Sequence, residues 1–151
     1  MKVSSLLADK RLDVVSLAPG ASLESAAKVM NYHGVGAVMI QDVVGNLVGI
    51  FTERDLVQAL ASIGPSVLHL SIGDFMTREV QTCRSIDDLS TVRALMKTYA
   101  IRHVPVVDQG RLVGMVSVRD LLASQLKEQD QEVSLYLTLS RARQGGVGYY
   151  S

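Results

Sequence analysis

The sequence has few of the residues that form disulfides or bind metal ions in small proteins. It has one cysteine, Cys83, no tryptophan, three prolines and 5% aromatic residues among 151. A single cysteine excludes an intramolecular disulfide framework and suits a reducing compartment, so we expect a cytoplasmic protein with Cys83 in an aliphatic core. His33 and His69 have no Cys, His or carboxylate at metal-ligand spacing, which predicts that the chain holds no metal.

Charge excess and long apolar runs are also missing. Fifteen Lys and Arg balance fifteen Asp and Glu, so the attraction that drives nucleic-acid binding is absent. No apolar run approaches the roughly 20 residues of a membrane helix, and Met1 to Leu7 is too short for a signal-peptide core. We therefore expect no nucleic-acid or membrane partner, and one compact domain or two half-sized repeats that share a core.

An internal repeat organises the chain. LVGIFTERDL at 47–56 matches LVGMVSVRDL at 112–121, and VGAVMIQD at 35–42 aligns with IRHVPVVD at 101–108. The helical pattern SLESAAKVM at 22–30 likewise aligns with DLSTVRALM at 88–96. The second copy is one residue shorter at a Gly-containing turn, where such a change is tolerated. We place the first copy at 3–64 and the second at 71–125, followed by a C-terminal helical or mobile tail at 126–151.

Each copy predicts the same order of elements, β-α-β-β-α. In the first copy we expect a strand at 14–17, a helix capped by Ser22 that ends near Gly34, a hairpin, and a helix from Thr52. In the second we expect a strand at 80–83, a helix at 87–99, strands at 104–108 and 112–116, and a helix from about Ser117. Short helical turns at 3–7 and 72–76, called lead-in segments below, precede the copies. Each small sheet leaves one apolar face uncovered, so stacking the two units, related by a pseudo-twofold axis, is the economical way to bury both.

The repeated signature resembles a known family. GIFTERD at 49–55 and GMVSVRD at 114–120 look like the nucleotide-binding signature of CBS domain pairs, and the resemblance covers about residues 3–125. It implies an α+β fold in which two tandem CBS motifs pack sheet to sheet with pseudo-twofold symmetry, so that residues 1–125 form one Bateman module. It also implies two clefts, in which the signature Asp holds ribose hydroxyls and the Thr or Ser meets a phosphate.

The chemistry of the signature agrees with that implication. A carboxylate accepts two hydrogen bonds and suits a vicinal diol, while N–H groups at a helix start suit an anion. Thr52 and Asp55 would serve one cleft, and Ser117 and Asp120 the other. Gly49 and Gly114 would leave room for a base or sugar beside the strand. A purely structural interpretation stays open, because Thr-x-x-Asp and Ser-x-x-Asp are also capping boxes.

Other candidate contacts follow from position. Arg102 and His103 precede a strand and could contact a phosphate, whereas the aligned Gly36 and Ala37 offer no such group. Backbone groups near Ser16, Val35 and Thr82 could read an adenine edge, although ordinary sheet pairing explains them equally well. The full set of predicted nucleotide-binding residues is Ser16, Val35, Gly36, Ala37, Thr52, Arg54, Asp55, Thr82, Arg102, His103, Pro105, Ser117, Arg119 and Asp120.

We expect a regulatory adenine-nucleotide sensor rather than an enzyme, because the acids and His103 form no recognisable nucleophile and base arrangement. AMP is the favoured ligand and NAD or NADH the second, with ADP or ATP as alternatives. Signalling would occur by a ligand-dependent change in the angle between motifs or in a homodimer contact, read by an effector protein that the sequence does not identify. The alternative is a ligand-independent homodimerisation or protein-interaction module.

Overall fold

The computed structural model describes residues 1–9 and 14–147. The chain forms two units, Met1–Ser117 and the segment from Val118 onward, and each is described by itself. The helices are α1 Val3–Asp9, α2 Leu23–His33, α3 Glu53–Ile63, α4 Leu89–Tyr99 and α5 Val118–Val147, with short 3₁₀ turns at Pro65–His69 and Ile72–Asp74. The strands are β1 Ser16–Leu17, β2 Ala37–Gln41, β3 Leu47–Thr52, β4 His103–Asp108 and β5 Arg111–Ser117.

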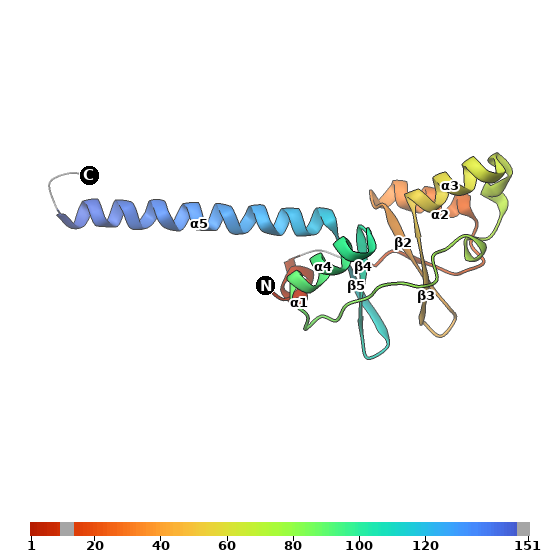
Figure 1. The fold of residues 1–151 in the computed structure, drawn as a ribbon, viewed down its shortest axis with the longest axis horizontal. Coiled ribbons are helices and arrows are strands. Elements are labelled where there is room, and N and C mark those ends of the chain that lie inside the picture. Colours follow the sequence, from red (N-terminus) through yellow and green to blue (C-terminus); the bar gives the residue numbers. More distant parts are fainter. Residues whose placement is uncertain (10–13, 148–151) are drawn as a thin grey trace. The chain divides into compact units, whose positions relative to one another are not determined.

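The first copy contains a three-stranded sheet in the order β1-β2-β3 (Figure 1). Strand β1 runs parallel to β2, and β2 runs antiparallel to β3. Helix α2 starts where predicted, because the Ser22 side chain accepts the backbone N–H of Ser25, and it ends at Gly34, whose φ of 63° is the left-handed conformation that glycine adopts without strain. The predicted order of elements is confirmed in this copy.

The second copy is built alike but with a weaker first strand. Strands β4 and β5 form a two-stranded sheet among the described residues, and the expected strand at 80–83 is reduced to a single parallel bridge between Cys83 and Val106. Cys83 donates its N–H to Pro105 and accepts from Val107, as a third strand would. The prediction of a full strand was therefore wrong in extent, although the position is paired as expected.

The two sheets share a core, as the repeat predicted. Ala37, Met39 and Ile50 of the first sheet form a buried cluster on which Leu112 and Met115 of the second sheet pack. A larger cluster lies beneath α2 and α3 and includes Phe51 and Ile40. The α+β fold with two copies stacked sheet to sheet is confirmed.

Each lead-in segment packs on the opposite copy. Leu7 of α1 lies where a side chain on Gly114 would stand, 2.8 Å from the ideal Cβ position, and Val3 donates its N–H to Asp87. Reciprocally, Met76 covers Gly49, with its Sδ 2.5 Å from the ideal Cβ position, while Ile50 and Thr77 exchange both backbone hydrogen bonds. The two glycines therefore admit protein side chains, which corrects the expectation that they make room for a base or sugar.

The second unit is a single long helix. Helix α5 continues through most of the tail that we expected to be partly mobile, and it ends at Val147, so positions 148–151 of that tail lie outside the described residues. No helix in the described part of the chain is long and apolar enough to cross a membrane.

Candidate functional site

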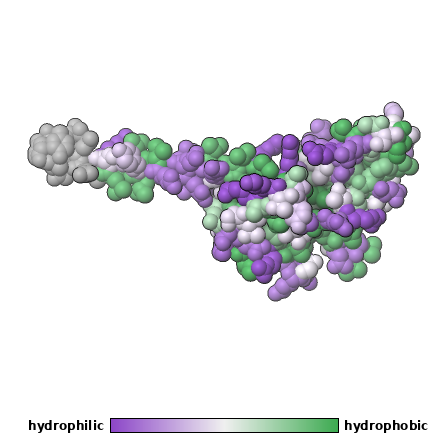
Figure 2. Space-filling model, viewed as in Figure 1, coloured by the Kyte–Doolittle hydropathy of each residue, from purple (hydrophilic) through white to green (hydrophobic). Residues whose placement is uncertain are grey.

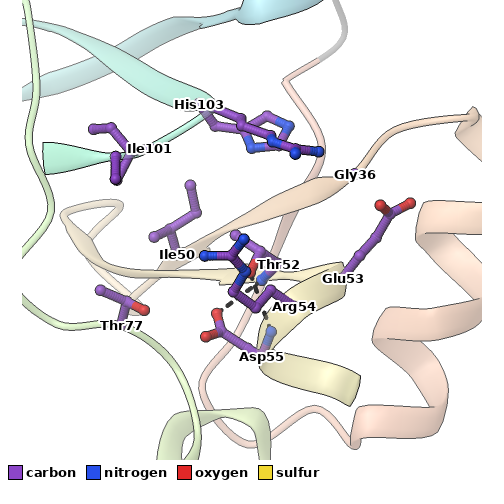
Figure 3. Close-up of a pocket in the computed structure, with 11 residues that line it drawn as sticks. Gly36, Ile50, Thr52, Glu53, Arg54, Asp55, Thr77, Ile101 and His103 are labelled. Carbon is purple, nitrogen blue, oxygen red and sulfur yellow. Dashed lines mark hydrogen bonds between the residues drawn. The ribbon is translucent and has the colours of Figure 1, made fainter. Parts of the chain in front are cut away.

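A cleft of about 230 Å³ opens between the two copies within the first unit (Figure 3). We call it the Thr52 cleft. Its lining residues are Gly36, Ile50, Thr52, Glu53, Arg54, Asp55, Thr77, Ala100, Ile101, Arg102 and His103. The start of α3 and the end of β3 supply one side, and the segment that leads into β4 supplies the other. The site therefore depends on both copies of the repeat.

A capping box sets the geometry at the start of α3. The N–H of Asp55 donates to Thr52 Oγ1 at 3.2 Å, and the N–H of Thr52 donates to Asp55 Oδ2 at 2.9 Å. The capping interpretation that competed with ligand binding is thus realised in the structure. It leaves Asp55 Oδ1 and the Thr52 hydroxyl hydrogen for a ligand, because the box uses one oxygen of the carboxylate and only the acceptor side of the hydroxyl.

The helix start offers fewer amides than the sequence suggested. The N–H of Glu53 donates to the carbonyl of Gly36 at 3.0 Å, and that of Asp55 is taken by the cap. Of the first three amides of α3, that of Arg54 has no partner among the described residues. An anion in the Thr52 cleft would therefore depend on side-chain cations more than on the helix terminus.

Charged side chains of both signs face the opening. Figure 3 shows Thr52, Arg54 and Asp55 gathered at the start of α3, with His103 across the opening on β4. Arg54 and Arg102 balance Glu53 and Asp55, so the cleft is close to neutral when His103 is neutral. Glu53 Oε2 and His103 Cε1 both lie 3.4 Å from the place where a Cβ on Gly36 would stand. Gly36 thus keeps the space between these two side chains open.

The structure brings six of the predicted residues together around this cleft. They are Gly36, Thr52, Arg54, Asp55, Arg102 and His103. Arg102 and His103, which the sequence could not assign to a cleft, line the one that contains Thr52. Their contact with a ligand stays a prediction.

The other predicted residues in the first unit lie elsewhere. Ser16 and Ala37 take part in the first sheet, where Ser16 pairs with Met39 and Ala37 with Thr52. Pro105 is buried in β4, and its carbonyl accepts the N–H of Cys83. Thr82 is exposed beside that bridge, and Val35 lines a separate hollow beside α2 and α3. None of these five lines the Thr52 cleft.

The second predicted cleft stays a prediction. Ser117 ends β5 in the first unit, while Arg119 and Asp120 lie in the first turn of α5, in the second unit. The contact of these three residues with a ligand is therefore still a prediction.

Five lining residues were missed by the site prediction. Ile50 could have been found, since it lies two positions before Thr52 on a strand and faces the same side. Ala100 and Ile101 directly precede the predicted Arg102. Thr77 had no such signal, because nothing in the pattern of 72–76 says on which copy it packs. Glu53 was not among the predicted ligand contacts, although it directly follows the predicted Thr52.

Among residues 1–9 and 14–147, no three His, Cys, Asp or Glu side chains are placed to hold a metal ion. Cys83 lies away from the Thr52 cleft, and burial, followed by the charges of Asp87 and Asp108, raises the pKa of its thiol to about 11. Such a thiol is protonated at neutral pH and is a poor nucleophile.

Comparison with known proteins agrees with the repeat. The family model for the CBS domain matches twice, at residues 3–62 and 72–127. A curated relative, an uncharacterized protein of Methanopyrus kandleri, is 34% identical over 113 residues, which cover 74% of this chain and 58% of that protein. The chain thus spans little more than half of the length of that relative.

Solved structures share the fold. A CBS-domain containing protein from Agrobacterium tumefaciens superposes with a TM-score of 0.80 and 38% identity, covering 83% of this chain and 99% of that one. The CBS domain pair of MJ0100, solved with 5′-methylthioadenosine and S-adenosyl-L-methionine, gives 0.74 and 30%, with 86% and 98% covered. A CBS domain protein from Pyrobaculum aerophilum, complexed with AMP, gives 0.73 and 27%, with 80% and 90% covered.

Two family matches in tandem, a shared core between the copies and close structural neighbours point the same way. The chain belongs to the CBS-domain family and carries a pair of CBS motifs.

Proposed function

We propose that the Thr52 cleft binds an adenine nucleotide reversibly and that the protein is a regulatory sensor. The observation that carries the proposal is the capping box, which presents Asp55 Oδ1 and the Thr52 hydroxyl to a space faced by Arg102 and His103. The free carboxylate oxygen suits a ribose hydroxyl, and the cations suit a phosphate. Ile50 and Ile101 supply apolar walls for a base.

The charge balance of the cleft favours a ligand with few phosphates. Two arginines face two carboxylates, so the cleft has no excess of positive charge to balance a run of several phosphates. AMP is therefore our first choice and NAD or NADH our second, with ADP and ATP behind them. The solved relatives that carry AMP, or S-adenosyl-L-methionine and 5′-methylthioadenosine, support an adenosine-bearing ligand.

Regulation would work by population shift. A ligand that touches both copies binds one relative arrangement of them better than another, so occupancy changes the populations of the two arrangements. An effector protein or a homodimer contact would respond to that change. We propose no catalytic role, because the polar side chains at the cleft form no nucleophile and base pair among the described residues. The proposed setting is the cytoplasm.

Thermal unfolding of the purified protein tests the proposal. We would measure the midpoint with AMP, ADP, ATP, NAD, NADH, S-adenosylmethionine and guanosine nucleotides. A ligand at 100 times its Kd stabilises the folded state by about 2.7 kcal/mol, a shift that is easily measured. Asp55→Asn removes the carboxylate charge but keeps an acceptor for the cap, and Arg102→Ala removes one cation. Each should weaken the shift with AMP.

Glu24→Gln is the matched control, because Glu24 is an acidic residue in the first turn of the other helix of the same copy, outside the cleft. It should leave the ligand shift unchanged. If no adenine ligand at millimolar concentration stabilises the wild type, the sensor proposal is wrong and the ligand-independent interaction module takes its place. If Glu24→Gln reduces the shift as much as Asp55→Asn does, binding lies elsewhere on the chain.

A further inference from the structure

Glu53 lines the Thr52 cleft with a charge that the fold itself does not use. Its side chain is exposed, and its carboxylate makes no hydrogen bond or ion pair within residues 1–9 and 14–147. The other carboxylate of the cleft, that of Asp55, is held in the capping box with Thr52. An unpaired carboxylate at the wall of a site for an anion repels part of the charge that the site receives.

The second copy of the repeat shows that the signature does not require this acid. Thr52 and Asp55, which form the cap, align with Ser117 and Asp120, whereas Glu53 aligns with Val118. The helix dipole favours an acidic residue in the first turn of either helix, yet only the first copy has one at this position. The carboxylate is therefore a feature of the Thr52 cleft and not of the repeat.

The Glu53 carboxylate lies close to the basic side of the cleft. Glu53 Oε2 and His103 Cε1 each lie 3.4 Å from the ideal Cβ position of Gly36, so the two atoms are no more than twice that distance apart. Figure 3 shows the two side chains on either side of Gly36. A phosphate oxygen that accepts a hydrogen bond from His103 would lie about 3 Å from the ring nitrogen. A phosphate in this position faces the carboxylate directly.

The side chain of Glu53 has no favourable place to which it can move away from such a phosphate. On its other side Glu53 lines the separate hollow beside α2 and α3, where Gly34 marks the negative end of the α2 dipole. Figure 2 shows hydrophobic as well as hydrophilic surface over these two helices. The apolar residues that line the hollow are Ala27, Met30, Val35 and Leu56. Both features disfavour a carboxylate in the hollow.

We propose that Glu53 is a specificity-determining residue of the Thr52 cleft, and that its carboxylate limits the negative charge of the phosphate chain that the cleft accepts. This inference rests on the proposed binding of an adenine nucleotide. Arg102 and His103 are available to the first phosphate, while every further phosphate adds negative charge near the same carboxylate. Because Coulomb repulsion grows in proportion to the charge of the ligand, Glu53 favours AMP over ADP and ADP over ATP.

Calorimetric titration of the full-length chain with adenosine, AMP, ADP and ATP, in the absence of divalent cations, tests the assignment. Glu53→Gln removes the charge and keeps the shape, so it should lower the ratio of the Kd for ATP to the Kd for AMP about fivefold. The variant should bind adenosine as the wild type does, because adenosine carries no phosphate. Glu53→Asp should keep the wild-type ratio, and Glu53→Lys should lower the ratio further than Glu53→Gln does. High salt should reduce these differences.

Glu24→Gln is the matched control, since it removes a carboxylate from the first turn of α2, where Glu24 pairs with Lys28 at 3.4 Å outside the cleft. It should leave the ratio unchanged. If AMP binds and Glu53→Gln also leaves the ratio unchanged, or alters all four ligands alike, the role of Glu53 is wrong while the proposed function stands. If no adenine compound binds the wild type or Glu53→Gln, both proposals are wrong. If Glu53→Gln weakens ATP binding once Mg²⁺ is added, the carboxylate holds a metal ion carried by the nucleotide, and the proposal of repulsion is overturned.

Discussion

The two copies of the repeat preserve their packing and differ in what they offer to a ligand. Each hairpin has a glycine covered by a lead-in segment from the other copy, Gly49 by Met76 and Gly114 by Leu7. The positions that face the cleft have diverged, because Arg102 and His103 stand where the first copy has Gly36 and Ala37. The glycines of the signature therefore serve the fold, whereas the basic side chains of Arg102 and His103 are offered to a ligand by the second copy alone.

The largest effect on stability is expected from substitutions that disturb the packing against the two glycines. A Cβ on Gly49 would stand 2.5 Å from Met76 Sδ and 3.0 Å from the carbonyl oxygen of Thr77, whereas the three atoms nearest to one on Gly114 all belong to the Leu7 side chain, the first at 2.8 Å. A methionine or leucine end can rotate away, but a backbone carbonyl in a paired segment cannot. We expect Gly49→Ala to lower the free energy of unfolding by about 1–3 kcal/mol and Gly114→Ala by less.

Urea titration of both variants measures the difference in their free energies of unfolding. Truncation of the side chain that packs on each glycine then tests the cause of that difference. In a double-mutant cycle, Leu7→Ala should remove most of the cost at Gly114. Met76→Ala should remove only part of the cost at Gly49, since the carbonyl stays in place. Equal costs at the two glycines, or full recovery at Gly49, would show that the carbonyl contact does not matter.

The next largest effect is expected at the N-caps of α2 and α4, the equivalent helices of the two copies. Ser22 caps α2 with its side chain, whereas the aligned Asp88 makes no cap bond to α4 and pairs with Lys2 at 3.0 Å, with both side chains more than half exposed. We expect Ser22→Ala to cost about 1 kcal/mol and Asp88→Ala a few tenths. Chemical denaturation compares them, and a larger loss for Asp88→Ala would mean that the tie to α1 outweighs the cap.

Some of these features could be predicted from the sequence and others could not. The caps at Ser22, Gly34 and Thr52 were predictable, because capping is local and depends on residue type at one position. The exchange of lead-in segments was not, since a short apolar pattern does not say which copy will cover it. Thr77 was missed in the cleft for that reason. The pairing of the Glu53 amide with Gly36 was equally hidden, because it joins segments 17 positions apart.

A smaller effect on stability is expected from Cys83, the buried residue that forms the single strand bridge of the second copy. Because the folded protein raises the pKa of this thiol from 9.0 to about 11, the unfolded state loses its proton first as pH rises. Stability should therefore fall between about pH 9 and pH 11 through this group. Cys83→Ala should show a shallower fall over that range in thermal unfolding, whatever its stability at pH 7. An unchanged slope would mean that the thiol is solvated in the folded state.

The smallest effect separates two aspartates at the same position of the repeat. Asp42 accepts the N–H groups of Val44 and Asn46 within its own hairpin, and the bond from Asn46 is the main cause of its lowered pKa. Asp108 instead accepts from Ser85, 23 positions away, and the bonds from Ser85 lower its pKa. The Asp42 carboxylate therefore stabilises the turn of its own hairpin, whereas the Asp108 carboxylate binds the segment that contains Ser85 to the second sheet.

Hydrogen exchange distinguishes these roles. Asp42→Ala should speed exchange at Val44 and Asn46, while Asp108→Ala should speed it at Ser85 and its neighbours. Both carboxylates have lowered pKa values, so their contributions are present above the unfolded pKa, near 3.8, and are lost as pH falls through the folded value. Protection of Ser85 in the wild type should therefore fall toward that of Asp108→Ala at low pH. If Asp108→Ala leaves Ser85 protected at neutral pH, the bridge at Cys83 holds the segment without the carboxylate.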